Sequence, residues 1–130
     1  MSNFFAFETL DAYKASRSIV KEVYTLIDTF PSKEDFALKS QIRRAIISVP
    51  SNIAEGSGRQ HPKEQAHFYE IAYASLLETF CQLEIATDLG YLSETEFKKI
   101  GEKIKTTSKL IAGLRNACYR TPRETVNRNL

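Results

Sequence analysis

Apolar residues recur every three or four positions in four separate segments of the chain, which is the spacing of a buried helix face. The first segment predicts a helix from Thr9 to Thr29 that stops at Pro31. Its apolar positions are Leu10, Tyr13, Val20, Val23, Tyr24, Ile27 and Phe30. Ser32 is followed three residues later by Asp35, a pattern typical of a helix start. We therefore expect a second helix directly after a short turn.

A proline lies inside the apolar stripe of this second helix. The stripe consists of Leu38, Ile42, Ala45, Ile46, Val49 and Ile53. Pro50 removes one backbone donor and clashes with the carbonyl four residues earlier, at a cost of ~3 kcal/mol in a straight helix. Ile53 keeps the register beyond it, so we expect a helix that is kinked at Pro50, resumes for one turn and ends at Gly56.

The third segment predicts the longest helix, from Pro62 to Leu89, with Gly90 at the position of a left-handed C-terminal cap. One face carries Tyr69, Ala72, Tyr73, Leu76, Leu77, Phe80 and Leu83. The apolar arc is widened by Ile71, Leu89 and the small residues Ala74, Ser75 and Cys81. An arc of this width indicates contact with more than one neighbour, another subunit included.

The fourth segment opens with Ser93 and Glu96, which form a capping box, and predicts a helix to about Tyr119. Spacings of three and four alternate without a slip, as in left-handed bundle packing. These positions are Phe97, Ile100, Ile104, Thr107, Ile111, Leu114 and Cys118. Pro122 ends the pattern.

Four long helices joined by short turns predict an all-α fold, an up-down-up-down antiparallel four-helix bundle. The chain has 130 residues, which suits one domain. We assign residues 1–120 to this domain and residues 121–130 to a basic, flexible C-terminal tail.

The sequence predicts a cytoplasmic protein. Two cysteines, Cys81 and Cys118, are too few for a disulfide framework, and both fall in apolar helical patterns that predict buried thiols. The N-terminus lacks the basic and apolar regions of a signal peptide, and no run reaches the ~18 apolar residues of a membrane helix. No membrane partner is expected.

A search for catalytic or metal-binding patterns predicts none. His61 and His67 are six residues apart, so they lie on different faces of a helix. Gly56 and Gly58 follow no strand and precede no Walker lysine. Ser48, Ser51 and Ser57 have no evident histidine and acid to activate them. We therefore expect no enzyme activity, no metal, no cofactor and no small-molecule substrate.

The net charge of +2 conceals an asymmetry along the chain. Residues 98–130 contain nine basic and two acidic residues, a net charge of +7, which leaves −5 for residues 1–97. Lys98, Lys105 and Lys109 share one helix face, and with Arg115 they form a candidate phosphate-binding surface. The alternative is a merely solvated face. No aromatic platform or helix-turn-helix accompanies them, so sequence-specific readout is not implied.

Basic and polar residues near Pro50 also allow two interpretations. Arg43 and Arg44 are candidate contacts, or they lie on a solvated face or pair with acids of the third helix. Asn52 and Glu55 form a partner site, or they satisfy backbone groups freed by the proline and the helix end. Arg59, in the loop that follows, is a further candidate contact.

The stretch QIRRAIISVPSNIAEGSGR, followed by FYEIAYASLLETFCQLEIATDLGYL, closely resembles the four-helix bundle family of 23S rRNA intervening-sequence proteins. The likeness extends from Phe7-x-x-Leu10 through Phe30-Pro31 to the fourth helix. Its most specific part is Pro50-x-Asn52-Ile53-Ala54-Glu55-Gly56.

The resemblance implies a bacterial protein that forms pentamers. It also implies similarity to the accessory variability determinant of diversity-generating retroelements, a barrel that binds nucleic acid and a reverse transcriptase through basic surfaces. No catalytic residues are carried over. Pro50, Asn52, Glu55 and Gly56 carry over as a structural motif, and Arg43, Arg44 and Arg59 as candidate basic contacts.

Two functions follow as hypotheses. The first is a non-enzymatic homo-oligomer that binds RNA or a nucleoprotein through distributed basic residues. The second is a protein-interaction scaffold that recruits a partner polypeptide, with nucleic acid incidental. Salt separates them, because phosphate binding weakens steeply as salt rises whereas an apolar interface does not.

Overall fold

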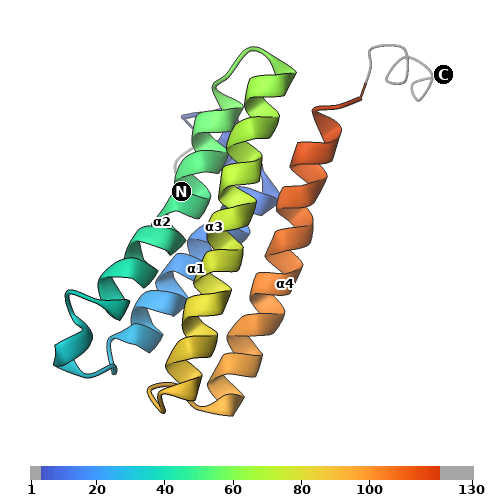
Figure 1. Ribbon diagram of the computed structural model, residues 1–130. Helices are drawn as coiled ribbons and strands as arrows, with labels where there is room; N and C mark the ends of the chain where they lie inside the picture. The colour runs from blue at the N-terminus through green and yellow to red at the C-terminus, as the bar shows by residue number, and fades with distance from the viewer. Residues whose placement is uncertain (1–3, 121–130) are drawn as a thin grey trace.

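The computed structural model describes residues 4–120, and all the regular secondary structure within them is helical (Figure 1). The helices are α1 (Asp11–Ile27), α2 (Leu38–Ser57), α3 (Pro62–Asp88) and α4 (Glu94–Ala117), with 3-10 turns η1 (Ala6–Thr9) and η2 (Ser32–Glu34). The predicted all-α fold with four helices is confirmed, and this part of the chain contains no strand. The predicted tail, residues 121–130, lies outside the described residues.

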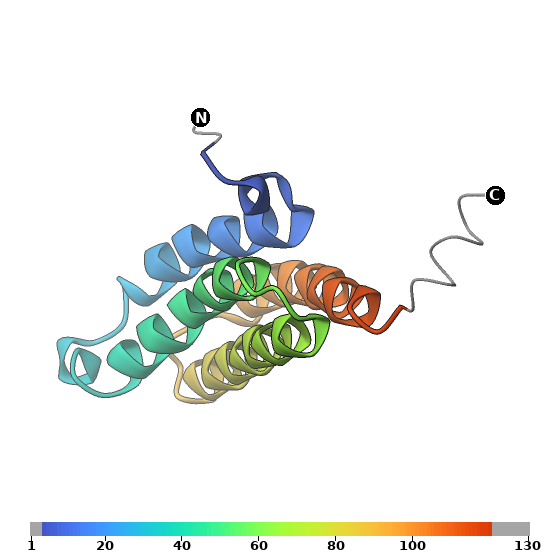
Figure 2. The ribbon, with the colours of Figure 1, turned by 90° about the horizontal axis from the view of Figure 1, so that it is seen from above.

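Consecutive helices lie side by side and run in opposite directions (Figures 1 and 2). Both α1 and α3 pack against α2 and α4, so α1 lies diagonally from α3 and α2 lies diagonally from α4. The centre is filled by fully buried aliphatic side chains: Ile19, Val23, Ile27, Ile42, Ile46, Val49, Ile53, Leu76, Leu83 and Ile111. Burying each contributes roughly 1.5–3 kcal/mol to the free energy of folding. The outward faces of α2 and α4 are therefore on opposite sides of the bundle.

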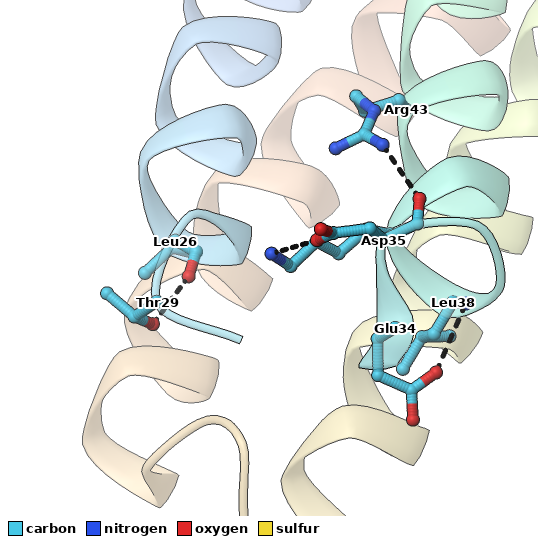
Figure 3. A network of polar contacts seen from close by, with 7 residues as sticks. Leu26, Thr29, Glu34, Asp35, Leu38 and Arg43 are labelled. Carbon is cyan, nitrogen blue, oxygen red and sulfur yellow. Dashed lines mark hydrogen bonds and ion pairs between the residues drawn. The ribbon is translucent and has the colours of Figure 1, made fainter. Parts of the chain in front are cut away.

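The connection between α1 and α2 differs from the prediction. Ser32 starts the 3-10 turn η2, not a helix, and α2 begins at Leu38 without a side-chain cap. Asp35 is engaged elsewhere: its Oδ1 accepts from Lys39 Nζ at 2.7 Å, and its carbonyl accepts from Arg43 Nη2 at 3.0 Å (Figure 3). Because Lys39 is only 8% exposed, its charge needs this carboxylate partner.

Glu34 ties this connection to the turn between α3 and α4. One carboxylate oxygen accepts from the Leu38 amide at 3.4 Å, and the other accepts from the Tyr91 hydroxyl at 2.8 Å. The hydrogen bond to Glu34 raises the pKa of Tyr91 above its ordinary value, and burial and the carboxylate charge act in the same direction. The neutral phenol therefore remains the donor that joins the two turns.

Two predictions for the turn between α3 and α4 are confirmed: the left-handed glycine cap and the capping box. Gly90 has φ +82°, a left-handed conformation that favours glycine. The Gly90 amide donates to the Thr87 carbonyl at 3.0 Å and the Tyr91 amide to the Ala86 carbonyl at 2.9 Å, which is a Schellman motif. Ser93 and Glu96 exchange the two hydrogen bonds of a capping box.

The prediction for the cysteines was wrong for one of the two. Cys81 is exposed and Cys118 is half-buried, and both are free thiols. Cys81 lies in the widened part of the apolar arc of α3, which the two neighbouring helices do not cover. Burial raises the pKa of the Cys118 thiol above its ordinary value.

Helix α2 continues across Pro50 and ends one residue after Gly56. A bend at Pro50 stays a prediction. Gly56 is buried where α2 meets the start of α3: a Cβ at this position would lie 2.8 Å from Tyr69 Cε1 and 3.0 Å from Phe68 Cβ. The absence of a side chain thus permits the close approach of the two helices.

We predict that Gly56→Ala lowers the free energy of unfolding by about 1–3 kcal/mol, because the new methyl group overpacks the contact with Tyr69. Gly113→Ala is the matched control, since a Cβ at this exposed helical position meets no atom within 4 Å. It should raise stability by about 0.5–1 kcal/mol. Urea denaturation followed by circular dichroism measures both, and equal effects of the two substitutions would contradict the close approach.

Candidate nucleic-acid interface

Three lysines form a row on the outward face of α4. Lys98, Lys105 and Lys109 are exposed, whereas Ile100, Ile104, Thr107 and Ile111 on the opposite face are buried. Within residues 4–120 the ammonium groups of these lysines have no ion pair or hydrogen bond. The row is about 16 Å long at 1.5 Å per residue. Exposed Glu102 lies on the same face between Lys98 and Lys105 and reduces the local positive charge. We call these three lysines the α4 lysine row.

Lys103, which also lies on α4, differs from these three lysines because its ammonium group already has a partner. Its ammonium group forms an ion pair with Glu22 of α1. The second oxygen of Glu22 is buried and has no partner in the described part of the chain. Lys103 therefore ties α4 to α1, and we do not include it in the row.

Arg115 points toward α3 and not toward the lysine row. Its guanidinium carbon lies 5.7 Å from the centroid of the Tyr73 ring, a cation–π contact. Its Nε donates to Asn116 Oδ1 at 3.4 Å. The side chain is half-buried, so packing between α3 and α4 accounts for its position.

Arg59 is exposed, but neighbouring side chains of the same chain contact its guanidinium group. Its guanidinium group lies 3.0 Å from a Glu55 oxygen and 3.9 Å from a Glu64 oxygen. It also lies 4.7 Å from the centroid of the Phe68 ring. These contacts close the turn between α2 and α3 and leave little charge for an external phosphate.

The two arginines of α2 differ from each other. Arg43 is half-buried and donates to the Asp35 carbonyl (Figure 3). Arg44 is exposed and lines a groove of about 320 Å³ together with Glu78 of α3, without an ion pair between them. Because α2 and α4 are diagonal, neither arginine belongs to the α4 lysine row. The seven predicted contact residues thus form no single patch.

The motif residues differ in what they contact. Asn52 donates to the carbonyl and to the hydroxyl of Ser48, both at 2.8 Å, and Ser48 in turn lies 2.9 Å from the Ser75 hydroxyl. The carbonyl that Pro50 leaves without its helical donor is that of Ile46, four residues earlier, so the Asn52 contact with Ser48 does not decide between the two interpretations. Glu55 pairs with Arg59. Asn52 and Gly56 lie at the contact between α2 and α3, whereas Pro50 and Ala54 face α1.

A groove between α1 and α2 was not predicted from the sequence. It has a volume of about 480 Å³, and its lining consists of Tyr13, Arg17, Val20, Lys21, Ile47, Pro50, Ser51 and Ala54. We call it the α1–α2 groove. Arg17 and Lys21 are four residues apart on one helix, a signal that was present in the sequence but ambiguous without knowing which helix lies beside them.

The described part of the chain holds no group of three or more His, Cys, Asp or Glu side chains placed to bind a metal ion. None of the helices of residues 4–120 is long and apolar enough to cross a membrane.

The family model for the 23S rRNA-intervening sequence protein matches residues 8–113, so the chain belongs to that family. The fold is also similar to the crystal structure of a protein of unknown function from the S23 ribosomal protein family of Bacteroides thetaiotaomicron. That similarity has a TM-score of 0.71 at 20% sequence identity, over 80% of this chain and 97% of the other. At this identity the likeness shows the fold. A search of curated proteins found no match.

The contacts of the α2 arginines predict different effects of their removal. Arg43→Gln should lower the free energy of unfolding by about 1.5–3 kcal/mol, because it loses a charged hydrogen bond to the Asp35 carbonyl. Arg44→Gln should stay within about 0.5 kcal/mol of the wild type. Thermal and urea unfolding measure the pair, and equal stability of the two variants would contradict a structural role for Arg43.

Proposed function

We propose that this member of the 23S rRNA-intervening sequence protein family is a non-enzymatic homo-oligomer that binds RNA or a nucleoprotein through the α4 lysine row. The observation that carries the proposal is the alignment of three exposed lysines, whose ammonium groups have no partners among residues 4–120, on a helix face that the bundle does not use. The family description names an intervening sequence of 23S rRNA, which makes RNA of that origin the natural probe.

Charge alone is sufficient for this kind of binding. Each phosphate that a lysine neutralises releases condensed counterions, so the affinity falls as salt rises. No large aromatic side chain accompanies the lysine row on its face of α4, so base stacking is not part of the proposal. We expect backbone binding with little sequence preference.

Self-assembly is the second part of the proposal. Leu77 and Ile85 of α3 are 47% and 44% exposed, and Leu89, directly after α3, is 54% exposed; the bundle provides no helix to cover them. Several large apolar side chains exposed along one helix mark an interaction surface. The resemblance suggests a pentamer, which remains part of the proposal.

The same apolar side chains support a second candidate function, a scaffold that recruits a partner polypeptide. In this case α3 binds the partner, and nucleic acid is incidental. Such an interface is insensitive to salt, whereas binding through the lysine row is not.

The test is a titration of a labelled 23S rRNA fragment with the purified full chain, freed of nucleic acid, between about 50 and 200 mM salt. A triple variant, K98Q/K105Q/K109Q, should weaken binding and reduce the slope of log affinity against log salt by roughly 2–3. The control variant K14Q/K33Q/K63Q removes the same charge from exposed lysines outside α4 and should keep most of the slope.

Equal losses in the two triple variants would contradict the assignment to α4. Affinity for RNA that does not change with salt, or no affinity, would overturn the RNA-binding proposal and favour the scaffold.

A further inference from the structure

The outward face of α3 presents a line of apolar side chains that no other helix of the bundle covers. It consists of Ala74, Leu77, Cys81, Ile85 and Leu89, spaced by three or four residues, all exposed. We call this line the α3 ridge. The buried residues of α3, such as Leu76 and Leu83, lie on the opposite face toward the core.

The α3 ridge is bordered by acidic side chains. Glu78, Glu84 and Asp88 are exposed, and within residues 4–120 none of them forms an ion pair. The only lysine or arginine of α3 is Lys63, at the other end of the helix. The α3 ridge is therefore a line of apolar side chains with negatively charged side chains beside it.

The α1–α2 groove has the complementary character. Its apolar lining includes Tyr13, Val20 and Ile47, and Ile47 is 45% exposed. Arg17 and Lys21 are the charged residues of the lining, which contains no acid. The side chains from Tyr13 to Val20 span about 10 Å along α1, close to the ~12 Å between Leu77 and Ile85 on α3. The middle part of the ridge thus matches the groove in length, apolar content and charge, whereas the whole ridge from Ala74 to Leu89 is about 22 Å long and extends beyond the groove.

We propose that the α3 ridge of one copy of the chain docks in the α1–α2 groove of the next copy. This inference rests on the homo-oligomer proposed above. Charge complementarity selects this partner surface. The two grooves between α1 and α4 are also lined by lysines, but acids offset their charge: Glu22 and Glu96 offset two of three lysines in one groove, and Glu102 offsets Lys103 in the other. The α1–α2 groove, which has two basic residues and no acid, is the most positive of the three. The lysine row of α4 has the right charge but lacks large exposed apolar side chains.

The docking has two consequences. Ridge and groove are different surfaces, so each copy uses one of each, and the assembly is head-to-tail. Such contacts form a ring when the rotation closes, and a filament when it does not. In both cases the α4 lysine row takes no part in the contact and stays available to RNA.

Size-exclusion chromatography with light scattering tests the docking. Ile85→Lys places a positive charge on the ridge opposite Arg17 and Lys21, and Ile47→Glu places a negative charge in the groove. Both positions are about half exposed, so both variants should fold, and each alone should be a monomer. A mixture of the two retains one intact ridge and one intact groove, and its two substituted surfaces carry opposite charges, so it should form complexes of at least twice the monomer mass.

Phe36→Lys is the control, because Phe36 is 99% exposed in the connection to α2 and belongs to neither surface. It should assemble like the wild type. Circular dichroism and a cooperative thermal transition verify folding, and complex formation in the mixture verifies it independently.

Three outcomes would overturn the docking, and they are distinguishable. A monomeric wild type overturns the homo-oligomer itself. Wild-type-sized oligomers of both variants leave the homo-oligomer intact and overturn only this pairing of surfaces. Monomers that do not combine on mixing show that an intact ridge and an intact groove do not suffice for contact, and they also overturn the pairing.

Discussion

Helix α3 packs against two helices at once, α2 and α4, and this double contact determines which surfaces of the bundle are left exposed. On the side of α2, the Tyr69 ring packs closely against the buried Gly56, and the hydroxyl groups of Ser48 and Ser75 are hydrogen-bonded. Toward α4, the rings of Phe80 and Phe97 lie 5.2 Å apart. Two neighbours cover only part of a helix surface, and the apolar arc of α3 is wider than that part. The bundle is therefore complete as a fold and yet leaves apolar residues of α3 in water.

Because these apolar residues of α3 are left exposed, the sides of the molecule differ in polarity and charge. The outward side of α3 is apolar and acidic, the groove between α1 and α2 is apolar and basic, and the outward side of α4 is basic without large apolar side chains. Contact between the first two surfaces buries apolar area and pairs opposite charges. The third surface offers charge alone, which suits a phosphate backbone.

The sequence predicted the fold well because each helix signal is local. The period of the apolar stripes, the capping box at Ser93 and the left-handed Gly90 needed no information from distant residues. The start of α2 was missed because Ser32 begins the 3-10 turn η2, and Asp35 bonds to Lys39 and Arg43 ahead of the helix that begins at Leu38. The candidate site was harder to predict. Periodicity places a lysine on a helix face, but the neighbouring helices decide whether an arginine such as Arg59 is already paired.

In the proposed assembly, RNA contacts α4, while α3 and the α1–α2 groove join the subunits. Ultraviolet crosslinking of the assembled wild-type protein to the rRNA fragment, followed by mass spectrometry of the peptides, distinguishes these roles. We expect the crosslinked peptides to come from Glu94–Ala117 and to disappear at high salt. Crosslinks concentrated in Asp11–Ile27, Leu38–Ser57 or Pro62–Asp88 would contradict this assembly, because these helices would then carry the RNA.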